Sequence, residues 1–316
     1  MPRLIEAEAQ EEVDDEIFVY MGGHQEVPDE VRRARIHKSV KIIRRRAFHS
    51  RQQLMSVEFH DGVEIIEEDA FNWCTSLSGS IKLLGIRIIE RKAFWGTDLT
   101  DVEFGDRLHT IEAEAFYNCV ELTTITMPHV RTIGYLAFFN CLDLTDLELP
   151  EELETLEEGT FHTCRNLERI TLPLKDDMIE NRVFHNCPNL TTVDLVGGIH
   201  NTVSSLYHES WRNEMKGEIN RINQDLLNTD AEPNTQVIRR WMSAVIRRLD
   251  HYKAEHHKLL KEATTLLELA LWKANLLDNE GGVLEKEGVR TTRGQRKRAR
   301  KEISITSGAS IVIKNV

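Results

Sequence analysis

The chain has 316 residues, of which 41% are apolar and 29% are charged, and its formal net charge is -12. This composition is typical of a globular protein with room for two domains, and it excludes a wholly disordered or fibrous chain. The negative charge argues against a protein that coats nucleic acid or anionic membrane with its whole surface. Five cysteines are too few for a disulfide scaffold.

Residues 1–16 contain seven acidic residues and one arginine. A secretory signal needs a basic start followed by an apolar run, so this segment does not read as one. The longest apolar stretches, such as residues 17–21, are far shorter than the roughly 20 residues that span a bilayer. We therefore expect an acidic disordered tail and an intracellular protein, cytoplasmic or nuclear, with reduced thiols.

An internal repeat organises most of the chain. A phenylalanine recurs at intervals of 22 or 23 residues, and a small or β-branched residue stands directly before it. An aliphatic residue lies five positions before each phenylalanine, from Ile43 to Ile179. Agreement at three positions in seven units predicts a repeat architecture. The phenylalanines are Phe48, Phe71, Phe94, Phe116, Phe138, Phe161 and Phe184.

Each unit also contains a strand-like stretch, of which residues 144–150 are a clear copy. Alternation places Leu147 and Leu149 on one face and Asp146 and Glu148 on the other. One unit cannot bury its apolar face alone, so we expect neighbouring units to stack around a continuous core. The predicted strands are residues 31–36, 54–59, 77–83, 99–104, 122–127, 144–149, 167–172 and 190–195.

The two ends of the repeat region are marked by glycine pairs. The first strand carries Arg33 and Arg35 outward and lacks a preceding phenylalanine, so it reads as part of an N-terminal cap. A hairpin formed by residues 17–20 and the turn at Gly22-Gly23 would complete this cap. Gly197-Gly198 follows the last strand and marks the other end.

The pattern L-x-x-I-x-x-x-A-F-x-x-C-x-x-L-x-x-I-x-L-P over residues 31–196 resembles the BspA-like class of leucine-rich repeats. The continuation, from LVGGIHNTVSSL to ITSGASIVIKNV, resembles uncharacterised repeat proteins that diatoms encode in large sets. The resemblance implies an α/β solenoid of about seven units with a parallel sheet on its concave face. It implies a binding scaffold and supplies no catalytic residues. Many members of the family are cell-surface proteins.

All five cysteines occupy one position of the repeat, three residues after the phenylalanine. Their spacing contains no C-x-x-C pair, so it does not favour zinc binding. A small residue in a stacked position is typically buried. We expect reduced thiols, with a disulfide between adjacent units as the alternative. The cysteines are Cys74, Cys119, Cys141, Cys164 and Cys187.

The outward strand positions are polar and contain no aromatic residue. Interface hot spots favour Trp, Tyr and Arg, so the face is either a site for a basic protein segment or a solvated surface. Residues 52–196 hold 27 acidic against 10 basic side chains, a net charge of -17 that would attract a cationic partner. The candidate partner-binding residues are Asp101, Glu103, Asp146, Glu148 and Asp194.

Beyond Gly198 the apolar spacing changes to three or four residues, which predicts helices. One stripe runs from Trp211 to Leu226, and a longer one runs from Trp241 to Leu277 before the stop at Gly281-Gly282. The polar segment 228–235 separates the two helices. The longer helix is longer than its partner, so the pair either caps the solenoid, or joins a second copy of the chain in a coiled coil or binds a helix of a partner.

A basic cluster follows the helices, with seven positive charges in residues 290–301. Such a cluster serves as a nuclear-import signal, binds nucleic acid or another acidic surface, or stays solvated. Its candidate residues are Arg293, Arg296, Lys297, Arg298, Arg300 and Lys301.

These patterns divide the chain into five parts. They are an acidic tail at 1–16, a cap with the first unit at 17–53, the solenoid at 54–200, a helical hairpin or coiled-coil module at 201–282, and a basic flexible tail at 283–316. We find no phosphate-binding loop, nucleophile elbow or metal-ligand spacing, so we expect no enzyme and no cofactor. The sequence favours a protein-interaction scaffold. The alternative is a nuclear or nucleic-acid-associated protein that acts through residues 290–301.

Overall fold

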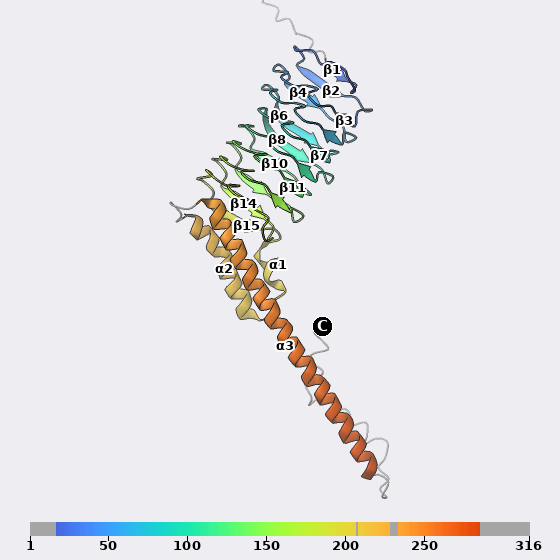
Figure 1. Ribbon diagram of the computed structural model, residues 1–316, viewed down its shortest axis with the longest axis vertical. Helices are drawn as coiled ribbons and strands as arrows, with labels where there is room; N and C mark the ends of the chain where they lie inside the picture. The colour runs from blue at the N-terminus through green and yellow to red at the C-terminus, as the bar shows by residue number, and fades with distance from the viewer. Residues whose placement is uncertain (1–16, 207, 228–232, 285–316) are drawn as a thin grey trace, which may run out of the picture. The chain divides into compact units, whose positions relative to one another are not determined.

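The computed structural model of the chain describes residues 17–206, 208–227 and 233–284 (Figure 1). The acidic segment 1–16 and the basic residues of 290–301 lie outside the described residues. The chain divides into one compact unit that ends at Leu249 and a second that begins at Asp250. The first unit contains the predicted solenoid, and the eight predicted strands are confirmed in it.

The longer strands of the solenoid pair in parallel and fall into three sheets, in the orders β1-β2-β4, β10-β8-β6 and β12-β14-β15, where β1 is Ile17–Tyr20. Their apolar residues alternate inward, as with buried Ala34 and Ile36 on either side of exposed Arg35. The strands are β2 Arg33–Ile36, β4 Ser56–Glu58, β6 Ser78–Leu83, β8 Asp98–Phe104, β10 Thr124–Thr126, β12 Asp146–Glu148, β14 Arg169–Leu172 and β15 Thr192–Leu195.

A second ladder runs along the solenoid, and its strands were not predicted. It contains the aliphatic residue five positions before each of the first six phenylalanines, in a parallel sheet of six two-residue strands with the order β13-β11-β9-β7-β5-β3. Ile179, before the seventh, adds a single bridge to Leu156. The first residue of each strand is half-buried and the second is buried. These strands are β3 Ile42–Ile43, β5 Ile65–Ile66, β7 Ile88–Ile89, β9 Thr110–Ile111, β11 Thr132–Ile133 and β13 Thr155–Leu156.

The repeat phenylalanines form a continuous stack inside the solenoid. All seven are fully buried, and the ring centroids of neighbours lie 4.8 to 5.9 Å apart with nearly parallel planes. The backbone N–H of each of the first six also donates to a carbonyl of the next turn, as from Phe116 to Ala137 at 2.8 Å. The stack therefore fixes each turn on its neighbour through both side chain and backbone.

The chain reverses around each phenylalanine through two residues in the left-handed backbone region. Around Phe116 these are Glu114, with φ of 58°, and Asn118, with φ of 60°. Asparagine tolerates this conformation better than most residues. Asn140 Nδ2 donates to Asn118 Oδ1 at 2.7 Å, which links this position from one turn to the next.

The N-terminal cap differs from the predicted hairpin. Strand β1 Ile17–Tyr20 pairs in parallel with β2, because the residues between them pass around the core, where Val27 and Val31 are buried, before re-entering in the same direction. Tyr20 packs against Phe48 with ring centroids 5.1 Å apart. The side chain of Gln25 accepts from Met21 N and donates to Val19 O, so it occupies part of the strand edge.

Within the described residues, three helices follow the last strand: α1 Gly198–Ser204, α2 Glu209–Leu227 and α3 Asn234–Leu284. The short helix α1 was not predicted, and α3 continues past the predicted stop at Gly281-Gly282, where glycine weakens a helix without forbidding it. The predicted stripe of α2 is buried from Met215 to Leu226, and Trp211 at its start is half-buried.

Helices α2 and α3 hydrogen-bond to the groups that the last turn leaves without a neighbour. Thr235 Oγ1 accepts from Phe184 N at 2.8 Å, where every earlier phenylalanine meets the carbonyl of a further turn. Asn234 Nδ2 donates to Cys187 O at 2.8 Å, and Asn223 Oδ1 accepts from Val193 N at 2.9 Å. These side chains cap the sheet edges that an eighth turn would otherwise cover.

Candidate binding surfaces

The outward side chains of the longer strands form two rows, which we call the strand face. Parallel pairing places residues from successive turns side by side, so that Asp146, Arg169 and Thr192 are neighbours in one row. Glu148, Thr171 and Asp194 are neighbours in the other. The predicted acidic residues all lie on this face, separated by strands that carry threonine or arginine.

Most of the predicted carboxylates have partners within the strand face. Hydrogen bonds from Thr100 and then Ser80 lower the pKa of Asp101, and Glu103 pairs with Lys82 at 2.7 Å. The remaining predicted residues lie around Arg169 or beside it. Arg169 has Asp146 at 3.9 Å and Asp194 at 4.0 Å, whereas Glu148 has no ion-pair partner among the described residues.

A hollow of about 630 Å³ opens on the strand face over β10, β12 and β14. It brings together Asp146 and Glu148 of the predicted set, while Asp101, Glu103 and Asp194 lie outside its lining. The outward side chains around it are those of Thr124, Thr126, Asp146, Glu148, Arg169 and Thr171.

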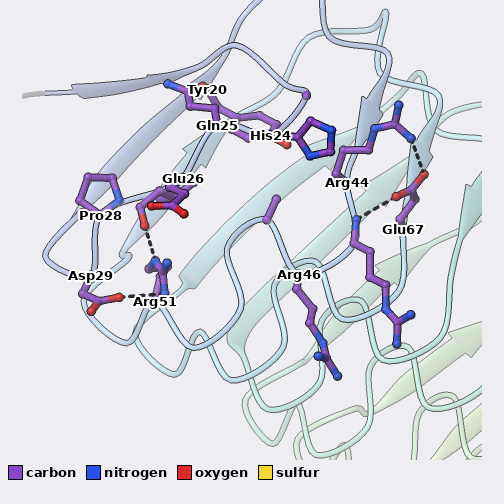
Figure 2. Close-up of a pocket in the computed structure, with 14 residues that line it drawn as sticks. Tyr20, His24, Gln25, Glu26, Pro28, Asp29, Arg44, Arg46, Arg51 and Glu67 are labelled. Atoms are coloured by element: carbon purple, nitrogen blue, oxygen red, sulfur yellow. Dashed lines mark hydrogen bonds and ion pairs between the residues drawn. The ribbon is translucent and has the colours of Figure 1, made fainter.

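A second hollow, of about 1150 Å³, lies between the cap and the first turn (Figure 2). Its basic side chains form ion pairs and hydrogen bonds with other groups of the chain. Arg51 pairs with Asp29 at 2.9 Å and donates to Val27 O at 2.8 Å. Arg44 pairs with Glu67 at 3.3 Å, as the dashed line in Figure 2 shows. The hollow is thus polar but has little free positive charge.

The first turn is basic throughout, with nine Lys or Arg and no Asp or Glu in residues 31–53. Five of these side chains pair with a carboxylate 23 residues later, one repeat length away. Four of the pairs are exposed or half-exposed and contribute little to stability, whereas Asp69 in the fifth is buried. They are Arg35–Glu58, Lys41–Glu64, Arg44–Glu67, Arg45–Glu68 and Arg46–Asp69.

Aromatic side chains gather on the turns beside the phenylalanine stack. The rings of Trp95 and Tyr117 lie 4.1 Å apart, those of Tyr117 and Phe139 4.6 Å, and those of Phe139 and His162 5.0 Å. We define the aromatic stripe as these four residues together with Trp73 and Tyr135. The stripe was not predicted: the prediction concerned the outward strand positions, whereas these four residues follow the repeat phenylalanine directly.

Two titratable side chains of the stripe have shifted pKa values. Burial raises the pKa of Tyr117, and the nearby groups of Glu114 and Tyr135 raise it further. Burial also lowers the pKa of His162, as do the neighbouring charges of His185 and Arg182. The stripe is therefore a packed and partly desolvated surface.

The cysteines lie in one column within the core, and all five are free thiols. Each thiol donates to the carbonyl of the phenylalanine one turn earlier, as from Cys119 to Phe94 at 3.1 Å. Burial raises the pKa of Cys74 to about 12 and that of Cys119 to about 11. Such thiols stay protonated at neutral pH and act as structural groups.

In the part of the chain that the structure describes, no cluster of three or more His, Cys, Asp or Glu side chains is arranged to hold a metal ion. Among the same residues, no helix is both long enough and apolar enough to cross a membrane.

Comparison with known proteins places the chain among repeat proteins. The sequence profile of the BspA type leucine-rich repeat region, in six copies, matches residues 29–84 and 87–214. A search of curated proteins found no match.

Three solved structures illustrate the likeness. A leucine-rich repeat protein of T. pallidum is 30% identical, with a TM-score of 0.39, over 42% of this chain and 62% of that one. A leucine-rich repeat protein of Bacteroides ovatus is 21% identical, with a TM-score of 0.39, over 52% and 55%. A leucine-rich cell surface protein of Faecalibacterium prausnitzii is 20% identical, with a TM-score of 0.36, over 52% and 59%. The chain thus spans less than two thirds of each.

Proposed function

Because the chain belongs to the BspA type leucine-rich repeat family, we propose that its solenoid is a non-enzymatic protein-binding module whose strand face holds a basic segment of a partner protein. Stacked repeats of this kind create extended surfaces that suit a protein ligand. The candidate contact residues are Asp101, Glu103, Asp146, Glu148 and Asp194.

The hollow around Glu148 is the observation that carries this proposal. Glu148 is exposed, has no ion-pair partner among the described residues, and lies in line with Thr171 across the strand pair. Thr126 and Thr171 offer hydroxyl groups on the same lining. A lysine or arginine of a partner would supply the missing charge, and the surrounding net charge of -17 would speed its approach in a salt-dependent way.

The test uses the full chain and a fluorescein-labelled ten-residue peptide of alternating lysine and threonine, with affinity measured by anisotropy. We expect Glu148→Lys to weaken binding about tenfold, because it replaces an attraction with a repulsion. Glu151→Lys is the matched control, because it makes the same change in net charge outside the hollow. Equal losses in both variants would mean that the peptide senses net charge alone, and the proposal would fail.

This proposal gives the C-terminal helices two roles. Helix α2 and the start of α3 cap the solenoid, and the remainder of α3 forms a homodimer. From residue 259 onward, α3 exposes eight large apolar side chains by 41% to 68%, which favours burial against another helix. These are Leu259, Leu260, Leu266, Leu269, Leu271, Trp272, Leu276 and Leu277.

Sedimentation equilibrium tests the homodimer. Replacing both Leu266 and Leu269 with glutamate should reduce the measured mass from two chains to one, because charged residues do not pack in a helical interface. Placing glutamate at Thr265, an exposed polar position on the same helix, is the control and should leave the dimer intact. A wild-type chain that sediments as a monomer would contradict the homodimer.

A further inference from the structure

The aromatic stripe has the composition of a binding hot spot, which the strand face lacks. Trp73 is 48% exposed and Tyr135 is 45% exposed, while Trp95 and Tyr117 between them are half-buried. Trp and Tyr dominate the energetics of protein interfaces because they bury large areas at small entropic cost. The stripe is made of residues next to the phenylalanine stack, so it is distinct from the strand face.

The stripe is also held in place by the repeat itself. Its inner rings stack on one another from turn to turn, and the ring of Trp73 lies over Gly96 of the next turn, where an added Cβ would be 3.7 Å from it. The backbone N–H of Tyr135 is fixed by a hydrogen bond to Glu157 at 2.8 Å. A partner would therefore meet aromatic groups that are already ordered, which reduces the entropic cost of binding.

A lysine of the chain already occupies one ring face of the stripe. Lys92 Nζ lies 4.5 Å from the ring centroid of Trp95, and it pairs with the carboxylate of Glu114 at 3.3 Å. One cation is thus held by an aromatic face and a carboxylate together. Beside this site, Glu114 lies close enough to Tyr117 to raise the pKa of its phenol, and Glu157 accepts the backbone N–H of Tyr135.

The charge around the stripe also favours a cationic partner. In the segments just before Phe94, Phe116, Phe138, Phe161 and Phe184, six carboxylates stand against three basic side chains. A ring face attracts a cation more strongly when acidic groups lower the local potential. The carboxylates are Glu90, Glu112, Glu114, Glu157, Glu158 and Glu180, and the basic residues are Arg91, Lys92 and Arg182.

We propose that the aromatic stripe is a second docking surface, which binds an arginine-bearing segment of a partner protein by cation–π stacking and carboxylate pairing. Arginine suits this surface better than lysine, because its planar guanidinium stacks on aromatic rings while its N–H groups still reach a carboxylate. This surface goes beyond the strand face of the proposed function and does not depend on it.

The experiment uses the full chain and a labelled twelve-residue peptide of alanine with four arginines. Its matched probe carries citrulline at the four positions, which keeps the shape and removes the charge. The peptide should shift the ¹⁵N indole signals of Trp73 and Trp95 and leave that of Trp272 in place. Trp73→Ala should weaken binding about tenfold, and Leu227→Ala, the control at an exposed apolar position of α2, should leave the affinity unchanged. Tyr135→Ala serves as a second exposed variant, and a thermal melt of each variant checks its folding.

Each alternative outcome overturns the proposal in a recognisable way. Equal binding of the citrulline peptide would show that the surface takes an apolar partner. Binding that Glu148→Lys abolishes and Trp73→Ala leaves intact would place the arginine peptide on the strand face. No movement of the Trp73 and Trp95 signals would remove the stripe as a site. In that case the lysine–threonine peptide still reports separately on the strand face, so the two proposals fail independently.

Discussion

Replacing Phe138 with alanine is expected to lower the free energy of unfolding by about 3–5 kcal/mol. The ring is fully buried and stacked on both sides, with its centroid 5.2 Å from that of Phe116 and 5.3 Å from that of Phe161. The turns above and below are fixed by their own ladders, so they cannot collapse into the space that the ring leaves. Urea denaturation of the full chain measures the loss.

Glu148→Ala is the matched control for this prediction, because Glu148 lies only ten residues away but is exposed on the strand face. Its unfolding free energy should stay within about 0.5 kcal/mol of the wild-type value. Equal unfolding midpoints for the two variants would contradict the assignment of Phe138 to the core stack.

Gly85→Ala is expected to destabilise the solenoid by about 3 kcal/mol or more, near the upper end for overpacked sites. A Cβ at this position would overlap the carbonyl oxygen of Asp61 and lie 2.8 Å from that of Val63. Both atoms belong to the backbone of the preceding turn, so relief requires the two turns to separate. Separation would break ladder hydrogen bonds on both sides of the glycine. Thermal melts of the purified variant measure the effect.

Gly217→Ala makes the same chemical change with the opposite expected sign. Gly217 lies within α2, and a Cβ added there would meet no heavy atom within 4 Å outside the adjoining helix backbone. Alanine is the better helix former by about 1 kcal/mol, so the melting temperature should rise. An unchanged stability at Gly85 would show that the spacing between turns does not limit side-chain size there. A fall in stability at Gly217 would contradict the expected gain in helix propensity.

The long strands could be predicted because residues such as Leu147 and Leu149 alternate with charged residues over several positions. The short strands could not, because a pair such as Ile65–Ile66 has no period of its own and becomes a strand only when a neighbouring turn lies beside it. The cap was predicted as a hairpin for a similar reason. Gly22-Gly23 is a local turn signal, and the parallel return of the chain depends on buried Val27 and Val31 farther along.

The candidate surfaces, too, could be predicted only where the pattern within one turn defines them. Alternation alone places Asp146 and Glu148 outward, so their position could be predicted. The ion pairs that Arg169 makes with Asp146 and Asp194 depend on the register between strands, which residue spacing within one turn does not define. The aromatic stripe had a usable signal in the residue after each phenylalanine, as at Trp95 and Tyr117. This signal could be interpreted only once the structure showed that the rings stack from one turn to the next.

The unequal ends of the solenoid determine how the chain would respond to mechanical load. At one end, Thr235, Asn234 and Asn223 bind the backbone of the last turn, whereas β1 at the other end is covered in part by the side chain of Gln25. Under tension applied at both termini, the turns would therefore detach in order from the β1 end. Each detachment would release one repeat, about 80 Å of extended chain, and would expose the next phenylalanine of the stack. The solenoid would then lengthen in regular steps, with the turn beside the helices the last to unwind.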